Sequence, residues 1–407
     1  MQELLERIAR EFGTPCFVYD FRDVVSRIET IRRAFGGRFQ ISYAMKCNPN
    51  PAIVRRLSEK IEWLDISSGG ELALAGKNGW DPARMSFTGP AKRDAELALA
   101  VDARVGAIVL ESTQEAERLD KLSAKARIVQ PILIRIAPSK MPPGFGVHMA
   151  GKPSQFGIDE EEIGPAIKQI ISLPHLRLCG FHIYAGTQCL REDVIVESYA
   201  AFISIFQRVC ESHNICPEKL IFGSGLGIPY YEQDKSLNLA AIAQRVNPLL
   251  DDLRQQPAYS KTDLILETGR FLIGPAGFYL TSVVSTKRSR GTEIRICDGG
   301  MNHHLGACGH LGSVIHRNYR MFKLGAEDAS GEQGRYDLFG PLCTSIDMLG
   351  HGVLMSKLEM GDIIAICNSG AYGLTASPIH FISHPPAREI LVGEGGSGET
   401  LQDISGA

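Results

Sequence analysis

Short apolar runs alternate along the chain with segments in which apolar side chains recur at helical spacing, from about residue 39 to residue 267. The intervening segments also carry helix signals, such as the capping box Ser112-Thr-Gln-Glu115. The pattern predicts eight β/α units, and therefore an α/β fold with a TIM-type (β/α)8 barrel over residues 22–272 rather than an open sheet. The expected barrel strands are residues 40–44, 62–66, 85–88, 107–110, 132–136, 178–184, 220–222 and 263–266.

After residue 275 the pattern changes to alternating strands punctuated by glycine, and most of them lack helical spacing between them. This change predicts a second, mainly antiparallel β domain over residues 273–392, joined by residues 1–21, in which Cys16–Asp20 has the pattern of a strand. The glycine-rich residues 393–407 are expected to form a disordered tail. The strands expected in this domain are residues 279–285, 293–297, 354–358 and 362–367.

Composition narrows the range of partners. The 407 residues include 43 basic and 46 acidic side chains, a net charge of -3 without a basic run, so nucleic acid is not an expected partner. No apolar stretch is long enough to span a bilayer, and the start lacks the pattern of a signal peptide. Ten cysteines without a Cys-x-x-Cys pair indicate reduced thiols. These features favour a cytoplasmic protein without a membrane partner.

Charged or titratable side chains lie at or beside the carboxyl ends of several expected strands. Lys46, Arg135, His182 and Glu267 all lie on or directly next to apolar runs. Loops are commonly polar, but charges next to buried strands need partners. Because a parallel barrel keeps its active site at the carboxyl ends of its strands, these four residues are candidates for the chemistry.

Two glycine-containing segments follow the seventh and eighth expected strands. They are Gly223-Ser-Gly-Leu-Gly227 and Gly269-Arg270. Loops in these two places commonly bind phosphate, since closely spaced glycines let backbone N–H groups converge and an arginine adds charge. The alternative is that the glycines form a tight turn. Their position after these two strands favours the phosphate site.

A phosphate site together with a strand-end lysine indicates pyridoxal 5'-phosphate, held on Lys46 as a Schiff base. Glu267 then has a role at the ring nitrogen, because a carboxylate there favours the protonated ring. The alternative for Glu267 is an ion pair with Arg270 or Arg135. His182 has the position of a residue that stacks on the ring, although a strand histidine is more often a core residue.

At this point the chain resembles the fold-type III, alanine-racemase-like pyridoxal-phosphate decarboxylases, which include the ornithine and diaminopimelate decarboxylases. The matching motifs extend over nearly the whole chain, and their number and order exclude coincidence. They are Tyr43-Ala-Met-Lys46, Asp65-Ile-Ser-Ser-Gly-Gly-Glu-Leu72, Gly89-Pro-Ala-Lys92, Gln155-Phe-Gly157, His182, Gly223-Ser-Gly-Leu-Gly227, Glu267-Thr-Gly-Arg270, Asp298-Gly-Gly-Met-Asn302, Gly340-Pro-Leu-Cys343 and Ser369-Gly-Ala-Tyr-Gly373.

The resemblance implies that Lys46 holds the cofactor, His182 stacks on its ring and Glu267 binds its nitrogen. It also implies that Cys343 is the acid that reprotonates the α-carbon, reaching in from the second subunit of a homodimer with shared active sites. Taken alone, Cys343 also fits a buried thiol. The other residues implied to bind the cofactor are Asp65, Arg135, Thr187, Gly225, Gly227, Gly269, Arg270 and Tyr372, and those implied to bind the substrate are Asp298, His303, Thr344 and Asp347.

Three departures from the family pattern bear on the substrate. Thr344 stands where diaminopimelate enzymes have glutamate and ornithine enzymes have aspartate, the groups that hold a distal ammonium. His303 and His304 come without the nearby Arg-Pro that serves a distal carboxylate, and the segment from His182 to Gln188 is two residues longer than usual. Three segments are similar to the butirosin-type decarboxylase of carrier-protein-bound glutamate, namely residues 182–188, 343–347 and 377–385. A fourth, residues 148–157, is similar to siderophore-pathway decarboxylases of citryl-amino-acid conjugates.

The expected reaction is therefore α-decarboxylation of a carrier-bound or citryl-linked amino acid in a specialised biosynthetic pathway. The longer loop and a flexible segment at residues 303–312 are expected to accommodate the larger group. Diaminopimelate, ornithine or lysine is the alternative substrate. A racemase is disfavoured because racemases of this fold place an arginine where Glu267 stands, and a non-catalytic homologue is disfavoured because Lys46 and Cys343 are both present.

A metal site is the remaining alternative. His303, His304, Cys308 and His310 are residue types that bind metals. Their segment is rich in glycine, and ligands need ordered elements in order to converge, so no metal is expected.

Overall fold

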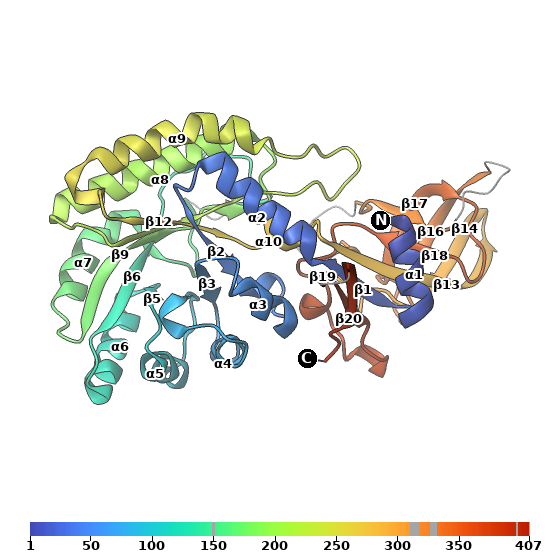
Figure 1. Cartoon of the computed structure of the whole chain (residues 1–407), viewed down its shortest axis with the longest axis horizontal. Coiled ribbons are helices and arrows are strands. Elements are labelled where there is room, and N and C mark those ends of the chain that lie inside the picture. Colours follow the sequence, from blue (N-terminus) through green and yellow to red (C-terminus); the bar gives the residue numbers. More distant parts are fainter. Residues whose placement is uncertain (149–150, 310–316, 326–331, 396–397, 407) are drawn as a thin grey trace. The chain divides into compact units, whose positions relative to one another are not determined.

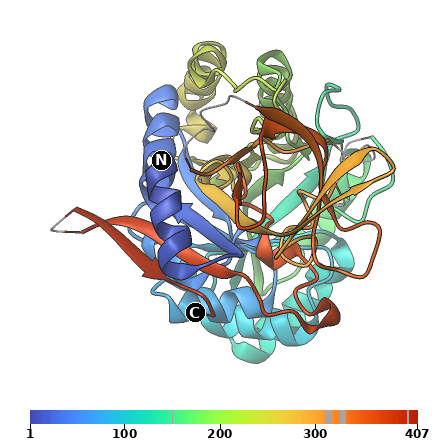
Figure 2. The same cartoon turned by 90° about the vertical axis from the view of Figure 1, so that its right-hand side faces the viewer.

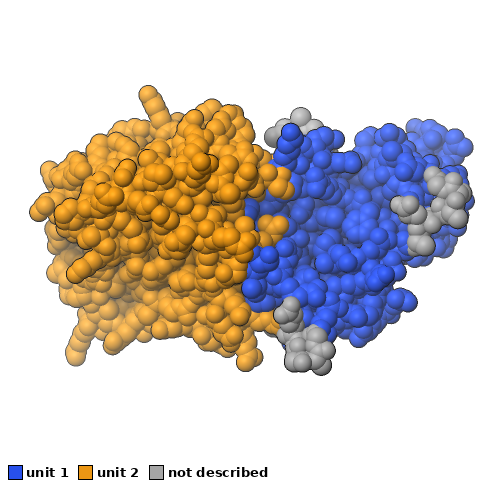
Figure 3. All heavy atoms as spheres, turned by 45° about the horizontal axis from the view of Figure 1, so that its top comes forward, with its two compact units in different colours: residues 1–26, 228–235, 270–407 blue, residues 27–227, 236–269 orange. Residues whose placement is uncertain are grey.

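Figure 1 shows the computed structural model of the chain, which describes residues 1–148, 151–309, 317–325, 332–395 and 398–406. The chain divides into two compact units, coloured separately in Figure 3. The barrel unit contains residues 27–227 and 236–269, and the β unit contains residues 1–26, 228–235 and 270–407. The expected bounds of the barrel at residues 22 and 272 differ from this division by a few residues, and residues 228–235 of the expected barrel belong to the β unit.

Eight parallel strands of the described residues close into the sheet of the barrel unit. Their hydrogen-bonded order is β5-β4-β3-β2-β12-β11-β9-β6, and β6 pairs with β5 to complete the ring. The TIM-type barrel expected from the sequence is confirmed, with every strand within a few residues of its expected place. The bounds are β2 Gln40–Ala44, β3 Trp63–Ile66, β4 Met85–Phe87, β5 Ala107–Leu110, β6 Gln130–Ala137, β9 Leu176–Ile183, β11 Lys219–Gly223 and β12 Asp263–Thr268.

Helices lie outside these strands (Figure 1) and bury their apolar faces against them. The Phe206 ring of α8, for example, packs edge-on against Phe222 of β11, with ring centroids 5.3 Å apart. Ser112 caps α6 by accepting a hydrogen bond from Glu115 N. Within the described ranges, no helix has both the length and the apolar character needed to cross a bilayer. The helices are α2 Phe21–Phe35, α3 Pro51–Leu57, α4 Gly69–Lys77, α5 Asp94–Ala103, α6 Thr113–Ala126, α7 Ile163–Ile171, α8 Glu192–His213 and α9 Leu239–Gln255.

Short elements complete the loops of the barrel unit. A single 3-10 turn, η1 (Met45–Cys47), follows β2 directly and carries Lys46. Strand β8 (Ile158–Asp159) extends the sheet beside β6, and β10 (Gly186–Thr187) pairs with β7 (Val147–His148). The other turns are η2 Pro82–Arg84, η3 Glu160–Glu162 and η4 Pro257–Tyr259.

The β unit is a mainly antiparallel sheet ordered β17-β16-β14-β13-β1-β19-β20, with β18 pairing with both β13 and β15. Figure 2 shows the strands of this unit in a view turned by 90° from that of Figure 1. The N-terminal strand β1 lies between β13 and β19, and α1 (Gln2–Phe12) buries Leu5 and Ile8 in the same core. The strands are β1 Cys16–Asp20, β13 Gly277–Ser289, β14 Thr292–Cys297, β15 Met321–Lys323, β16 Gln333–Phe339, β17 Met348–Ser356, β18 Ile363–Ile366, β19 Arg388–Gly395 and β20 Gly398–Asp403. Short helical pieces are α10 Arg270–Ile273, η5 Leu374–Ala376 and η6 Phe381–Ser383.

The expectation of a disordered tail from residue 393 is wrong for the described residues. Strand β19 continues to Gly395, and β20 pairs with it in antiparallel register, with Val392 opposite Leu401. Leu401 packs on the core of the β unit and Ile404 is 2% exposed. The glycines of this segment belong to a hairpin, which a composition argument does not distinguish from disorder.

Candidate active site

The amine of Lys46 lies between two buried carboxylates at the carboxyl ends of barrel strands. Its Nζ is 3.6 Å from Oδ2 of Asp65, on β3, and 3.9 Å from Oε1 of Glu267, on β12. The Lys46 side chain is 41% exposed, whereas the two acidic side chains are 0% and 3% exposed. The strand ends therefore place an accessible amine beside two carboxyl groups that water does not reach.

The two carboxyl groups differ in protonation. Burial and the nearby charge of Glu267 raise the pKa of Asp65 to about 7. Burial also opposes the ionisation of Glu267, but a hydrogen bond to His182 and the charge of Lys46 outweigh it and lower the pKa of Glu267 to about 2. Glu267 is thus the carboxylate of the pair, and Asp65 is the group that keeps a proton until near neutrality.

His182, at the end of β9, holds Glu267 in place. Its Nε2 lies 3.1 Å from Oε2 of Glu267, and both side chains are buried. Because the Glu267 carboxylate only accepts hydrogen bonds, Nε2 carries the proton and donates it. The other ring nitrogen of His182 is buried and has no hydrogen-bond partner among the described residues.

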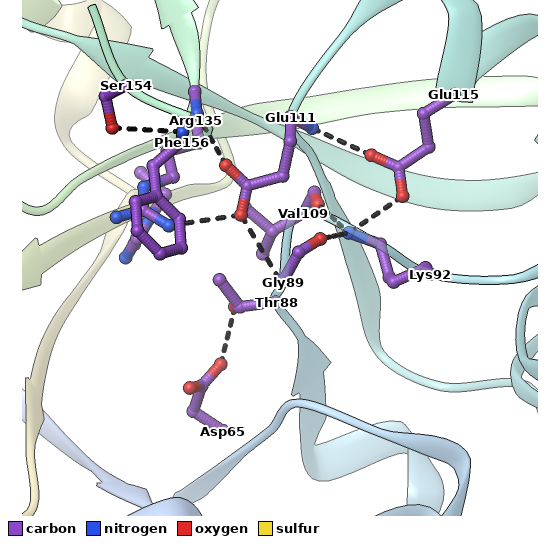
Figure 4. Close-up of polar contacts among 12 residues, drawn as sticks. Asp65, Thr88, Gly89, Lys92, Val109, Glu111, Glu115, Arg135, Ser154 and Phe156 are labelled. Carbon is purple, nitrogen blue, oxygen red and sulfur yellow. Dashed lines mark hydrogen bonds and ion pairs between the residues drawn. The ribbon is translucent and has the colours of Figure 1, made fainter.

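Arg135 lies beside His182 in the barrel, since the two residues are directly paired between β6 and β9. Its Nη1 donates to Oε1 of Glu111 across 3.1 Å, and its guanidinium stacks at 4.6 Å on the ring of Phe156 (Figure 4). The charge of Arg135 also helps to lower the pKa of Glu267. Glu111 was not among the predicted site residues.

The predicted glycines of the barrel unit are required by close packing within the protein. Gly225 has a φ of +65°, and a Cβ added there would lie 2.6 Å from the ring of Phe145. A Cβ on Gly227 would lie 2.7 Å from a backbone oxygen, and one on Gly269 would lie 2.8 Å from Sγ of Cys47. These glycines, and Thr187 in β10, lie in loops at the carboxyl ends of the strands, but their packing alone accounts for glycine at these positions.

Arg270 and Tyr372, two residues expected to bind the phosphate, meet in the β unit. The Arg270 guanidinium lies 4.6 Å from the ring of Tyr372, and its Nη1 donates to the hydroxyl of Tyr230 across 2.6 Å. The Nε of Arg270 is buried and lacks a hydrogen-bond partner among the described residues. An arginine with a donor left over is suited to binding an anion.

The loop from Gly340 to Asp347 presents Cys343 and Thr344. Cys343 is exposed and Thr344 is partly buried. The predicted alternative of a buried thiol is therefore wrong in the isolated chain. Asp347 turns inward, accepting hydrogen bonds from Met301 N at 2.6 Å and Leu342 N at 2.8 Å, and burial raises its pKa.

Asp298 and His303, both expected to bind substrate, have protein partners in the β unit. Asp298 accepts hydrogen bonds from the hydroxyls of Thr14, Thr281 and Ser282 at 2.5, 2.7 and 2.7 Å. The His303 ring lies 3.2 Å from the hydroxyl of Tyr279 and 2.9 Å from the carbonyl of Pro385. Burial lowers the pKa of His303.

The expectation of a flexible segment at residues 303–312 is wrong for its described part, residues 303–309. His303, His304 and Cys308 are each about 1% exposed. The Nε2 of His304 lies 2.9 Å from Oγ of Ser369, and burial lowers the pKa of His304 to about 3. His310, the last member of the metal alternative, lies outside the described residues.

Residues 21–274 match the family model described as the pyridoxal binding domain of pyridoxal-dependent decarboxylases. The chain belongs to this family. The decarboxylase is 33% identical, over 96% of its length and 91% of the relative, to an L-glutamyl–acyl-carrier-protein decarboxylase of Niallia circulans. It is 28% identical, over 95% of its length and 96% of the relative, to a Staphylococcus aureus decarboxylase whose substrate is an L-alanin-3-ylcarbamoylmethyl derivative of 2-hydroxybutanedioate. Its fold matches that of the Helicobacter pylori diaminopimelate decarboxylase complexed with L-lysine, with a TM-score of 0.85, 25% identity and 98% and 95% of the two chains covered.

The decarboxylase is therefore an enzyme that depends on pyridoxal phosphate, as the sequence predicted. Three observations on the described residues fit that cofactor: the exposed amine of Lys46 beside buried acids, the ionised carboxylate of Glu267, and the unpaired buried Nε of Arg270. A primary amine, an anion for a ring nitrogen and a cation for a phosphate are the groups that pyridoxal phosphate requires.

Sequence reasoning missed residues that support the decarboxylase site indirectly. Tyr230 fixes Arg270, and Ser86 and Thr88 donate to Oδ1 of Asp65 at 3.1 and 2.6 Å. The only signal for Tyr230 was its position shortly after the Gly223–Gly227 segment. Ser86 and Thr88 lie on or directly after β4, where alternation points one side chain in two toward the barrel interior.

Proposed function

We propose that the decarboxylase removes the α-carboxylate of an amino acid that is bound to a carrier protein or linked to citrate, in a specialised biosynthetic pathway of the cytoplasm. One observation carries the choice of a substrate without a distal ammonium. Asp347, the one acidic residue of the Gly340–Asp347 loop, is buried and holds two backbone N–H groups. With Thr344 in the position of the family's acid, the loop offers no carboxylate to a distal ammonium.

We propose the following division of labour around the cofactor. Lys46 holds pyridoxal phosphate through its amine, His182 lies against the ring, and Glu267 binds the ring nitrogen. Bound pyridoxal phosphate supplies a protonated ring that takes up the electron pair left when carbon dioxide departs. The remaining contacts to the cofactor are assigned to Asp65, Arg135, Thr187, Gly225, Gly227, Gly269, Arg270 and Tyr372.

The chain's own groups have distinct tasks in this proposal. Because Glu267 stays ionised, it can hold a proton on the ring nitrogen throughout the reaction. Asp65 can exchange a proton with the Lys46 amine near neutral pH, since its pKa is raised to about 7. The exposed thiol of Cys343, from the second subunit of a homodimer, then gives its proton to the α-carbon.

Asp298, His303 and Asp347 have a different task in this proposal from the one that the sequence indicated. Their polar atoms are engaged by the protein, so we assign them to holding the loops around Cys343 and Thr344 rather than to binding substrate. Thr344 keeps its assignment to the substrate. A neutral hydroxyl is suited to an amide or ester oxygen near the far end of the substrate.

A panel of substrates tests the proposal by mass spectrometry of the amine products. The panel contains glutamyl–carrier protein, a citryl-linked diamino acid, diaminopimelate, ornithine and lysine. We expect the small diamino acids to react at least about tenfold less efficiently, because each lost charge-assisted contact is worth about 1.5–3 kcal/mol. Efficient turnover of free diaminopimelate or ornithine contradicts the proposal and favours the standard activities of the family.

The variant Thr344→Glu tests the same preference for conjugated substrates over free diamino acids. It introduces the acid that the family uses for a distal ammonium, on a loop whose backbone Asp347 already fixes. We expect kcat/KM for free diamino acids to rise and that for the conjugated substrates to fall. A neutral control, Thr344→Gln, has a similar volume and is expected to give no gain for the diamino acids.

A further inference from the structure

A buried ion pair lies next to the candidate active site and takes no part in the function proposed above. Lys92, in the loop after β4, places its Nζ 2.8 Å from Oε1 of Glu115, on α6. The same Nζ donates to the carbonyl oxygens of Gly89 and Val109 at 2.6 and 2.9 Å (Figure 4). The two charged side chains are 1% and 5% exposed. The ammonium group therefore makes two hydrogen bonds and one ion pair, all of them buried.

Stability alone does not explain this pair, because buried ion pairs are commonly no more stable than well-packed apolar replacements. What the pair provides is a fixed geometry. The second oxygen of Glu115 accepts a hydrogen bond from the backbone N–H of Glu111 across 2.8 Å. Lys92 thus holds Glu115, and Glu115 holds the backbone at the end of β5.

The side chain of Glu111 continues the chain of contacts. Its Oε1 accepts from Arg135 Nη1 at 3.1 Å and from Gly89 N at 3.2 Å. Its Oε2 accepts from Gly157 N at 2.6 Å. Glu111 is 6% exposed, so these contacts are shielded from water and sensitive to small displacements.

This series of contacts ends at Arg135, which belongs to the candidate active site. It lies opposite His182 in the sheet, and its charge acts on Glu267. A shift of the backbone at Glu111 would move the carboxylate that holds the guanidinium. The rings of Phe156 and Tyr184 also lie against the guanidinium, at 4.6 and 5.7 Å, but they offer it no charged acceptor.

We propose that Lys92 and Glu115 are positioning residues of this enzyme: they set the backbone at Glu111, and Glu111 sets the guanidinium of Arg135 beside the cofactor ring. The inference rests on the cofactor-binding role proposed above for Arg135. It assigns to the Gly89-Pro-Ala-Lys92 motif a task in placing a distant charge, and neither residue touches the reacting groups.

Two double variants separate positioning from the loss of charge. In Lys92→Met/Glu115→Gln, the glutamine oxygen can still accept from Glu111 N, and its amide can donate to one of the carbonyls that Lys92 served. In Lys92→Met/Glu115→Ala, the bond to Glu111 is lost. Both variants lack the ion pair, so they differ in the tie to Glu111.

Hydrogen exchange of the cofactor-free protein measures whether Glu111 keeps its hydrogen bonds to neighbouring amides. In the alanine double variant we expect the amides of Gly89 and Gly157, both held by Glu111, to exchange at least about tenfold faster. The glutamine double variant should keep the wild-type exchange at these amides. Arg84→Met, which removes hydrogen bonds at the other end of β4, is the control and should leave both amides unchanged. Equal exchange in the two double variants overturns the proposal.

The affinity for pyridoxal phosphate measures whether a displaced Arg135 weakens cofactor binding. We expect the alanine double variant and Arg135→Met each to weaken pyridoxal phosphate binding about tenfold, and the triple variant to bind no more weakly than Arg135→Met. Losses that multiply in the triple variant contradict the proposed route through Arg135. If Arg135→Met binds pyridoxal phosphate normally, the role proposed for Arg135 is wrong, and the exchange of Gly157 alone decides whether Lys92 and Glu115 position Glu111.

Discussion

At the scale of single residues, Asp65 and Glu267 behave differently although both are buried near the same lysine. Asp65 accepts hydrogen bonds from the hydroxyls of Ser86 and Thr88, which carry no charge. Glu267 is hydrogen-bonded to His182 and lies within reach of two cations. A charge-assisted partner stabilises a buried carboxylate more than a hydroxyl does, and this difference separates the two pKa values.

The pH dependence of folding should show the raised pKa of Asp65. Below its usual value of 3.8 the group is protonated in both states, and between there and about 7 only the unfolded state has lost the proton. The contribution of Asp65 to stability therefore falls as pH rises across this window. The lowered pKa values of the buried His303 and His304 act in the opposite direction, but they do so in wild type and in Asp65→Asn alike. Between pH 5 and 7 we therefore expect the cofactor-free wild type to lose about 2 kcal/mol of stability relative to Asp65→Asn. Thermal unfolding over a pH series measures the slope.

Glu267→Gln should be measured in the same pH series. The lowered pKa of Glu267 affects stability only below the usual glutamate pKa of 4.5. The titration of Glu267 therefore does not change stability above pH 5. Removing its charge, however, removes one cause of the raised pKa of Asp65. We expect the stability loss to end at a lower pH in this variant. A wild-type slope that persists in Asp65→Asn would falsify the assignment of the slope to Asp65.

Lys46 gives a second prediction at this scale. Reduction of the holoenzyme with borohydride should attach pyridoxal phosphate to the peptide that contains Lys46, as mass spectrometry of a digest detects. Lys46→Ala should show no attachment and no turnover, because Lys46 is the lysine that the described residues place between the two acids. Lys77→Ala, at an exposed position on α4, is the matched control and should behave as wild type. Attachment at a different lysine refutes the assignment.

At the scale of elements, strand β9 shows how closely the barrel is packed. Its register with β6 shifts between Ile132 and Leu133, next to Gly180. Gly180 has a φ of +149°, and a Cβ added there would lie 1.8 Å from the backbone oxygen of Lys219 on β11. The glycine lets β9 bend between its two neighbours and carry His182 to the mouth of the barrel.

Gly180→Ala should therefore destabilise the barrel by about 3 kcal/mol or more, since backbone atoms on both strands must move. Gly76→Ala is the control, because Gly76 lies in α4 with open space around its Cβ position. Alanine there should stabilise the protein by about 0.5–1 kcal/mol through helix propensity. Urea unfolding of both variants measures the two changes, and a neutral Gly180→Ala contradicts the packing argument.

At the scale of the whole molecule, the residues of the proposed reaction come from both compact units. Lys46 belongs to the barrel unit and Cys343, exposed on its loop, to the β unit. In the proposed homodimer the second subunit supplies Cys343. Two inactive variants that each lack one of these residues should then complement each other.

Mixing Lys46→Ala with Cys343→Ala under conditions of subunit exchange should restore activity. Half of the dimers are then mixed, and each mixed dimer has one complete site, so we expect roughly a quarter of the wild-type activity. Separate incubation of each variant is the control. An absence of recovery, with exchange verified by mass spectrometry of the mixed dimers, rules out shared active sites.

The sequence by itself determined the barrel, five of the nine described strands of the β unit and the residues at the strand ends, but not β15, β16, β19 and β20. These follow from local patterns: apolar runs of strand length, helical spacing between them, and polar residues directly after each strand. Lys46, His182 and Glu267 could be predicted because a parallel barrel brings the carboxyl ends of its strands together. The strand-end lysine and the two glycine-containing loops indicated the cofactor, and the family motifs then supported it.

Only the tertiary structure shows which polar residues already have hydrogen-bond partners within the protein. Asp298, His303 and Asp347 resemble ligand-binding residues in the sequence, but their partners are as far away in the chain as Thr14 and Pro385. The buried pair of Lys92 and Glu115 is equally invisible to local patterns. The physical reason is that a hydrogen bond depends on the distance between two atoms after folding, whereas a sequence pattern reports only which side chains share a face of one element.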